Sequence, residues 1–165
     1  TGEKPVEVTT GPRGVTIGIS SDISFGSGSA NLKSGIIPVL KGIVPMILSS
    51  YFMVAVEGHT DTDQLPESFQ EKFPSNWELS GARAAAVVRE LVKMGVDPTR
   101  LQAVGFAEYV PRDRPTDRVI DNDMIRELNT TRELKARNRR VEITFLASGL
   151  KSSTSKLPVE ESEEG

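Results

Sequence analysis

An acidic and a basic side chain stand on either side of one predicted strand-to-helix connection. Asp61 ends the segment Val56-Glu-Gly-His-Thr-Asp61, and Arg83 lies in Asn76-Trp-Glu-Leu-Ser-Gly-Ala-Arg83-Ala. A carboxylate accepts hydrogen bonds from an ammonium group, and the planar guanidinium of arginine grips a carboxylate through two parallel hydrogen bonds. The two residues therefore predict a pocket for a ligand that carries both charges, such as an amino-acid end group.

A simpler interpretation of these two residues is an interior ion pair in which Asp61 and Arg83 neutralise each other. On the charge pattern alone, this interpretation is favoured over a pocket. It would leave neither group available to a ligand.

Two predicted elements must position these side chains. Asp61 follows Tyr51-Phe-Met-Val-Ala-Val56, a short apolar run that is typical of a central strand buried on both faces. Arg83 lies on a predicted helix that begins near Asn76 and ends at Gly95. It falls at the edge of the apolar stripe of this helix, so its stem can pack while its charged head reaches outward.

Further strands and helices flank this connection. The patterns predict a strand over Gly14–Ile19, a helix from Lys33 to about Leu48 that is kinked or broken at Pro45, a turn and strand over residues 97–106, a short helix from Thr130 to about Arg137, and a final strand over Arg140–Leu146. Helices that alternate with strands predict an α/β fold, a two-layer sandwich with a mixed four-stranded sheet and two main helices. A right-handed crossover would make the second and third strands parallel. The polar segment 112–132 is predicted to be an exposed loop.

The composition predicts one domain with polar ends. Only 37% of the 165 residues are hydrophobic, which is low for a fully compact body of this length. We expect a folded domain over residues 13–147, a disordered linker over residues 1–12 and a disordered acidic tail over residues 148–165. The chain has no run of eighteen or so apolar residues and no secretion signal at its start. It begins with Thr1 and lacks an initiator Met, so we expect it to be a fragment of a longer protein from which a membrane span or signal has been removed.

Several other functional classes are not expected. A net charge of -3 argues against binding to nucleic acid, which needs a basic face. The chain has no Cys, and His59 is its single His, so the three or four ligands of a zinc site are missing and we expect neither metal nor cofactor. His59 is interpreted as a support for its loop. The segment Phe25-Gly-Ser-Gly-Ser29 lacks the lysine of a phosphate-binding loop.

Three ordered motifs resemble the peptidoglycan-binding domain shared by OmpA, Pal and the flagellar stator protein MotB. They are Gly58-His-Thr-Asp61, Asn76-Trp-Glu-Leu-Ser-Gly-Ala-Arg83-Ala and Asn138-Arg-Arg-Val-Glu142, and the resemblance covers roughly residues 13 to 147. It implies the fold of the OmpA C-terminal domain. It also implies that Asp61 and Arg83 grip the diaminopimelate residue of a peptidoglycan stem peptide, which reverses the preference for an ion pair.

The resemblance implies lesser contacts to the ligand as well, from Thr60, Leu79, Asn138 and Arg139. For Asn138 and Arg139, turn capping and a solvated strand start are equally good interpretations. The segment Phe25-Gly-Ser-Gly-Ser29 would form a loop beside the ligand.

An insertion over residues 62–77 leads into the overlapping phrase Phe73-Pro-Ser-Asn-Trp-Glu-Leu-Ser80, which is similar to the stator branch of the family, MotB and PomB. This branch implies a periplasmic anchor that fixes a flagellar stator to the cell wall. It would be tethered to the inner membrane by an N-terminal transmembrane helix absent from this chain, would form a homodimer, and would have a stator A subunit of the MotA or PomA kind as its partner. Trp77 is predicted to pack under the insertion.

Two alternatives stay open. The first is an envelope-tethering protein of the OmpA or Pal kind. The second is a cell-wall hydrolase, with Glu57 and either Asp61 or Asp63 as the acid and base of a glycosidase. The period of a strand places Glu57 and its neighbours on opposite faces of the sheet, which disfavours the hydrolase, and the chain is not expected to be an enzyme.

Overall fold

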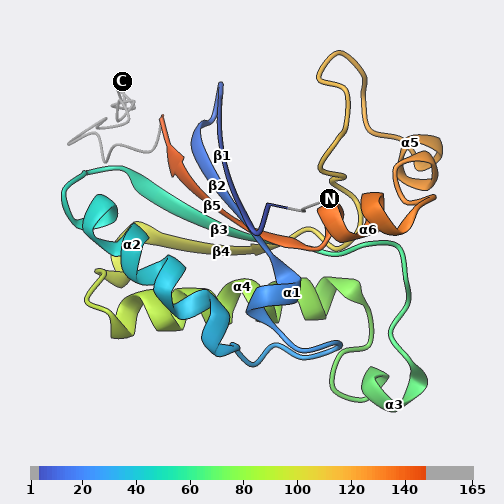
Figure 1. Ribbon diagram of the computed structural model, residues 1–165, viewed down its shortest axis with the longest axis horizontal. Coiled ribbons are helices and arrows are strands. Elements are labelled where there is room, and N and C mark those ends of the chain that lie inside the picture. Colours follow the sequence, from blue (N-terminus) through green and yellow to red (C-terminus); the bar gives the residue numbers. More distant parts are fainter. Residues whose placement is uncertain (1–3, 148–165) are drawn as a thin grey trace, which may run out of the picture.

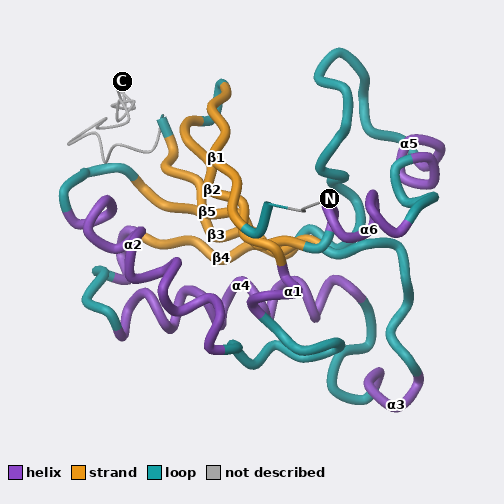
Figure 2. Tube along the Cα trace, viewed as in Figure 1, coloured by secondary structure: helices purple, strands orange, loops and turns teal. Residues whose placement is uncertain are grey.

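The computed structural model describes residues 4–147, so the tail predicted over residues 148–165 lies outside the described residues. One mixed sheet forms the centre of the fold, and helices α2 and α4 cover the same face of it (Figures 1 and 2). The predicted two-layer α/β sandwich is therefore confirmed, with five strands in the sheet rather than four. Within residues 4–147, no helix is long and apolar enough to cross a membrane.

The strands lie in the order β1-β2-β5-β3-β4, with β3 and β4 parallel, as predicted, and the other neighbours antiparallel. They are β1 (Val6–Gly11), β2 (Gly14–Ser20), β3 (Met53–His59), β4 (Leu101–Gly105) and β5 (Arg140–Leu146). The helices are α1 (Ser21–Ser24), α2 (Ile37–Leu48), α3 (Glu67–Gln70), α4 (Asn76–Lys93), α5 (Asn122–Glu127) and α6 (Arg132–Asn138), with short 3-10 turns at Ser34–Ile36 and Pro98–Arg100.

Strand β1 corrects the prediction of a disordered linker over residues 1–12. It pairs along its whole length with β2, from Val6 opposite Ile19 to Gly11 opposite Gly14. Gly14 has φ 130°, a conformation that favours glycine, and a Cβ there would lie 1.9 Å from the carbonyl oxygen of Phe145. The Pro and Gly residues near position 12 therefore mark a tight hairpin turn and not a linker.

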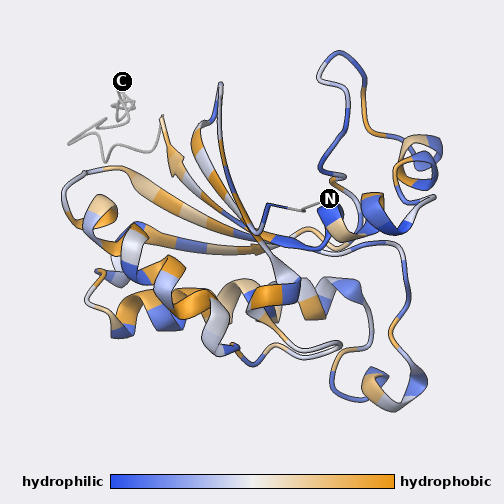
Figure 3. Ribbon diagram, viewed as in Figure 1, coloured by the Kyte–Doolittle hydropathy of each residue, from blue (hydrophilic) through white to orange (hydrophobic). Residues whose placement is uncertain are grey.

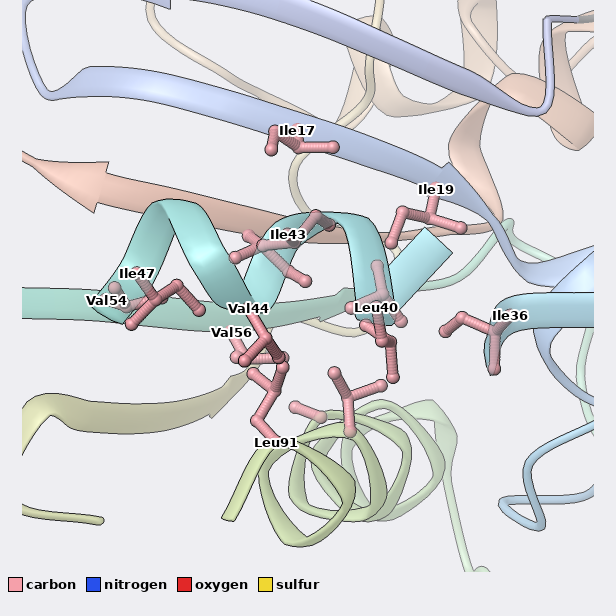
Figure 4. Packing of buried hydrophobic residues seen from close by; sticks show 14 of the residues in the cluster. Ile17, Ile19, Ile36, Leu40, Ile43, Val44, Ile47, Val54, Val56 and Leu91 are labelled. Carbon is pink, nitrogen blue, oxygen red and sulfur yellow. The ribbon is translucent and has the colours of Figure 1, made fainter. Parts of the chain in front are cut away.

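Helix α2 runs through Pro45 without ending there, so the predicted break is absent. Pro45 removes one backbone hydrogen bond, but Pro45 and Lys41 both lie on the exposed side of the helix, where water can satisfy the free carbonyl. The opposite side carries the core residues Leu40, Ile43, Val44 and Ile47, which pack against Val54 and Val56 of β3 and Leu91 of α4 (Figure 4).

Helix α4 lies unusually close to the sheet. A Cβ at Gly58 of β3 would come within 2.1 Å of the Ser80 carbonyl oxygen, and one at Gly105 of β4 within 2.5 Å of the Gly81 nitrogen. Ser75 caps the helix by accepting a hydrogen bond from the Trp77 amide. These contacts fix the start of α4 against the end of β3, which is the connection that carries the candidate site.

The segment 112–132 is only partly a loop. It contains α5, whose Met124 and Ile125 are buried, and Asp121 caps this helix by accepting from the Met124 amide. The segment is mostly hydrophilic in Figure 3, and the two adjacent apolar residues within the helix were too weak a signal to predict it.

Candidate functional site

A cleft of about 430 Å³ opens where β3 meets α4. Its walls come from α1 and the loop after it, the end of β3, the insertion before α4, the first turns of α4 and the start of β5. The charged and polar residues that line it include Ser21, Asp22, Lys33, Thr60, Asp61, Asp63, Gln64, Asn76, Arg83 and Arg139, and the apolar ones include Phe25, Leu65 and Leu79. Such a volume is typical of a site for a small molecule or a short peptide end.

Asp61 is held rigidly at the end of β3. One carboxylate oxygen accepts from the Asp63 amide at 2.8 Å, and the other lies 2.8 Å from the Nη1 of Arg139. Thr60 donates to the Asp61 carbonyl at 2.9 Å, and Asn76 donates to the Asp63 carbonyl at 3.1 Å. Each carboxylate oxygen has a second lone pair, so Asp61 can still accept from a ligand.

Arg83 is buried on the opposite wall, and its guanidinium is held by backbone carbonyls. Its Nε donates to Ser29 at 2.9 Å and its Nη2 to Gly26 at 3.2 Å, while the group lies over the ring of Phe25 at 5.0 Å from the centroid. Burial lowers the pKa of Arg83 to about 10, so it keeps its charge at neutral pH. Among residues 4–147, no carboxylate lies within 4.0 Å of it to form an ion pair.

The ion pair between Asp61 and Arg83 is therefore absent, and Arg139 is the cation that pairs with Asp61. The same guanidinium also contacts Asp22, with its Nε and Nη2 each 3.3 Å from a carboxylate oxygen. Burial opposes the charge of Arg139, but the hydrogen bonds to Asp22 and Asp61 outweigh it and raise the pKa of Arg139.

Five of the six predicted site residues line the cleft: Thr60, Asp61, Leu79, Arg83 and Arg139. Asn138 does not. Its amide donates to the Leu128 carbonyl at 2.9 Å and to the Asn129 side chain at 3.0 Å, and its oxygen accepts from the Arg112 amide at 2.8 Å. These are the bonds of a residue at the end of α6 that fixes the turn after α5 and the backbone at Arg112.

Asp22 and Lys33 were not predicted in the site, and Asp63 was considered as an acid of the hydrolase alternative. Asp22 comes two residues after β2, and Arg139 comes directly before β5. Because β2 and β5 are antiparallel neighbours with Ser20 opposite Arg140, Asp22 and Arg139 meet at one end of the sheet. Asp22 and Arg139 are 117 residues apart in the sequence, so this contact could have been predicted only from the pairing of β2 with β5.

His59 and Trp77 take other positions. His59 is buried against Phe106, with ring centroids 5.2 Å apart, which agrees with a supporting role. Trp77 is 52% exposed and stacks on Tyr109, so the prediction that it packs under the insertion was wrong. Within the described part of the chain, no group of three or more His, Cys, Asp or Glu side chains is placed to hold a metal ion.

Residues 24–126 match the model of the OmpA family. Among curated proteins, YtxE of Bacillus subtilis (strain 168) is 32% identical over 142 residues, covering 86% of this chain and 52% of that protein. Motility protein B of the same organism is 28% identical over 156 residues, covering 93% of this chain and 53% of that protein. The chain thus spans about half the length of these relatives.

Two solved structures share the fold. A MotB-like protein from Desulfovibrio vulgaris has a TM-score of 0.70 and 28% identity, over 84% of this chain and 78% of that one. The cell wall anchor of the T6SS from Pseudomonas aeruginosa has a TM-score of 0.69 and 30% identity, over 86% of this chain and 87% of that one. The family match covers more than half of the sequence and includes the cleft's two opposed charges, Asp61 and Arg83, so the chain belongs to the OmpA family.

Proposed function

We propose that this chain is a non-catalytic peptidoglycan-binding anchor, which holds the diaminopimelate residue of a stem peptide in the cleft. The observation that carries the proposal is the state of Arg83, a buried guanidinium whose charge faces no carboxylate within 4.0 Å among residues 4–147. A buried charge is costly unless it is paired, so the missing partner is best supplied by a ligand.

The proposed binding mode uses both walls of the cleft. The ligand's carboxylate would accept from the Nη1 of Arg83, which makes no hydrogen bond within the described residues. Its ammonium group would donate to Asp61, whose position is fixed by Asp63 and Arg139. Leu79 and Phe25 would contact the aliphatic chain between the two ends.

We further propose that the anchor belongs to a flagellar stator B subunit. Motility protein B relatives, at 28% identity in Bacillus subtilis and 35% in Escherichia coli (strain K12), support this role. In that case the domain works in the periplasm, a membrane helix elsewhere in the protein tethers it to the inner membrane, and it acts as a homodimer with a stator A subunit.

A second candidate is an envelope tether of another machine or of the OmpA or Pal kind. It is favoured by the likeness to the cell wall anchor of the T6SS, which at 30% identity and a TM-score of 0.69 is as similar as the MotB-like structure. The peptide chemistry of the cleft would be the same in both. The residues that precede Thr1 in the full protein would distinguish them.

The hydrolase alternative finds no support in the structure. Glu57, its required acid, does not line the cleft. Its carboxylate is buried and held by Arg13 through contacts of 3.0 and 3.2 Å, and it also accepts from Thr144 at 3.3 Å.

Co-sedimentation with purified sacculi tests the anchor. Arg83→Ala and Asp61→Asn each remove a charge-assisted contact worth about 1.5–3 kcal/mol, so retention should fall about 10- to 100-fold in apparent affinity. Arg89→Ala is the matched control, because Arg89 lies on the exposed side of the same helix and outside the cleft. Equal retention of Arg83→Ala and wild type would refute the proposal.

A further inference from the structure

The cleft contains a second cation that has no carboxylate partner. Lys33 lines the cleft, and its ammonium donates to the Asp22 carbonyl at 2.9 Å. Within residues 4–147, it makes no ion pair within 4.0 Å. Lys33 is exposed and Arg83 is buried, but both side chains donate only to carbonyl oxygens within the described residues. Two such cations in one cleft give it room for two ligand carboxylates.

One loop ties the two cations together. Phe25 and Leu32 form an antiparallel bridge, and the Lys33 amide donates to the Ser24 carbonyl at 2.8 Å, so the loop between them closes on itself. Its carbonyls at Gly26 and Ser29 hold Arg83, and Lys33 stands at its base. Lys33 is an exposed residue, but the closed loop fixes its backbone and its ammonium is held by the Asp22 carbonyl, so the fold limits the separation of the two cations.

A buried hydroxyl that lines the same cleft also lacks a partner. Ser21 lines the cleft, is 3% exposed, and its Oγ makes no hydrogen bond to any described residue. Nearly all buried polar groups are hydrogen-bonded, and one that is not calls for an explanation. A hydroxyl rotates freely among staggered positions, so the Ser21 side chain can turn toward a group bound in the cleft.

The neighbouring carboxylate of Asp22 is already neutralised and does not prevent an anion from binding at this position. Asp22 carries the carboxylate nearest to Ser21 in the sequence, but both of its oxygens accept from Arg139 at 3.3 Å. Its charge is thereby compensated by a cation that also pairs with Asp61. The ammonium of Lys33 is therefore the cation that would bind a second anionic group of the ligand.

We infer that Lys33 and Ser21 form a second carboxylate-binding position in the cleft. This inference rests on the proposed function and makes it more specific: the ligand carries a zwitterionic end for Asp61 and Arg83 and a second free carboxylate for Lys33 and Ser21. In a stem peptide, the second carboxylate is either the other carboxylate of a chain-terminal diaminopimelate or the α-carboxylate of the adjoining γ-linked glutamate.

Calorimetric titration with three synthetic peptides tests the inference. The parent is L-Ala-γ-D-Glu-meso-diaminopimelate; one derivative is amidated at the terminal diaminopimelate carboxylate outside the zwitterionic centre, and the other at the α-carboxylate of glutamate. One amidation should weaken binding to the wild type by about 10-fold, as expected for loss of a charge-assisted hydrogen bond. The derivative that is affected identifies which carboxylate is bound.

The variants Lys33→Gln and Ser21→Ala should each remove most of that 10-fold preference while leaving the affinity for the affected derivative unchanged. Lys41→Gln, an exposed lysine on α2 outside the cleft, should keep the preference. The inference is overturned if the wild type binds all three peptides equally, or if the preference survives in both variants. If no peptide binds to the wild type at all, the proposed function itself fails, which is a different outcome.

Discussion

The Nη1 of Arg139 lies 2.8 Å from a carboxylate oxygen of Asp61, and the same guanidinium bridges to Asp22. This arrangement divides the charges of the cleft into two roles. Arg139 compensates the acids and fixes their positions, while Arg83 on the other wall keeps a charge that no described residue neutralises. A cleft built in this way holds its acid in place and reserves its free cation for a ligand.

The link between Arg139 and Asp61 should be measurable in the stability of the domain. Arg139→Gln leaves the buried Asp61 without a cation and should lower the free energy of unfolding by about 1–3 kcal/mol, below the full cost for a buried pair because Arg139 is partly exposed. Urea unfolding measures it. In the double variant with Asp61→Asn, the loss of unfolding free energy should be smaller than the sum of the losses in the two single variants.

Arg126→Gln is the control for this comparison, because Arg126 pairs with Asp123 at the surface, where both side chains are 71% exposed and ion pairs contribute about 0–1 kcal/mol. Equal costs for Arg126→Gln and Arg139→Gln would contradict the assigned role of Arg139.

Gly58 should tolerate no side chain. In Gly58→Ala the new Cβ would meet the Ser80 carbonyl, which is backbone and cannot move without shifting α4, so we expect a loss of more than about 2 kcal/mol in unfolding free energy. Gly42→Ala is the matched control: Gly42 is exposed within α2 and has nothing within 4 Å, so alanine should stabilise that helix by about 0.5–1 kcal/mol. Thermal unfolding of the two variants should therefore shift in opposite directions.

Removal of the unpaired Ser21 hydroxyl should stabilise the protein while reducing its selectivity. A buried polar group without a hydrogen bond costs about 1–3 kcal/mol, and Ser21→Ala removes that cost. Denaturant unfolding without ligand should show the gain. A clear loss of stability in Ser21→Ala would show that the hydroxyl has a partner within the fold and is not reserved for a ligand.

The stability of the domain should fall as the solution becomes mildly acidic. Burial lowers the pKa of His59 to about 4. Glu142, 3.6 Å away, favours the charged imidazolium, whereas the positive charges of Arg140 and Arg114 disfavour it. As the pH falls from 6.5 to 4, His59 becomes protonated in the unfolded chain but stays neutral in the folded protein. Up to roughly 3 kcal/mol of the free energy of unfolding is therefore lost over that range.

Replacement of the ring isolates this contribution. His59→Phe keeps an aromatic side chain against Phe106 but cannot titrate, so its stability should be flat from pH 6.5 to 4.5. Further acidification should destabilise both proteins, because hydrogen bonds from Arg112 to Glu7 and from Arg137 to Asp113 lower the pKa values of these two acids. Parallel slopes for the two proteins above pH 4.5 would exclude His59 as the source.

Much of the fold was predictable because its long elements carry strong periodic patterns. The apolar stripe of α4 and the stop at Gly95 predicted that helix with nearly its observed bounds, and β5 was predicted with its observed bounds. Strand β1 was missed because its alternation is weak: only Val6 and Val8 are apolar, and Val8 is 66% exposed. Its stability comes from pairing with β2, which is a tertiary contact.

The residues of the candidate site could be predicted where they belong to one connection between elements that are adjacent in the sequence. Asp61 and Arg83 belong to such a connection, and both line the cleft. The pairing of Asp61 with Arg139 depends on β5 lying between β2 and β3, an arrangement that no local pattern encodes. Asn138 adjoins Arg139 in the sequence, yet its side chain is directed to the turn instead of the cleft.

The measurement that tests the central claim most directly is a nuclear magnetic resonance titration of the Arg83 Nε–H signal. With meso-diaminopimelate peptide, this signal and the amides of Asp61 and Asp63 should shift together along one saturable curve. A matched peptide with lysine keeps the side-chain ammonium but lacks the carboxylate beside it, so it should leave the Arg83 signal in place. If the Arg83 signal stays unchanged while the peptide saturates another surface, the cleft is not the binding site and the account is wrong.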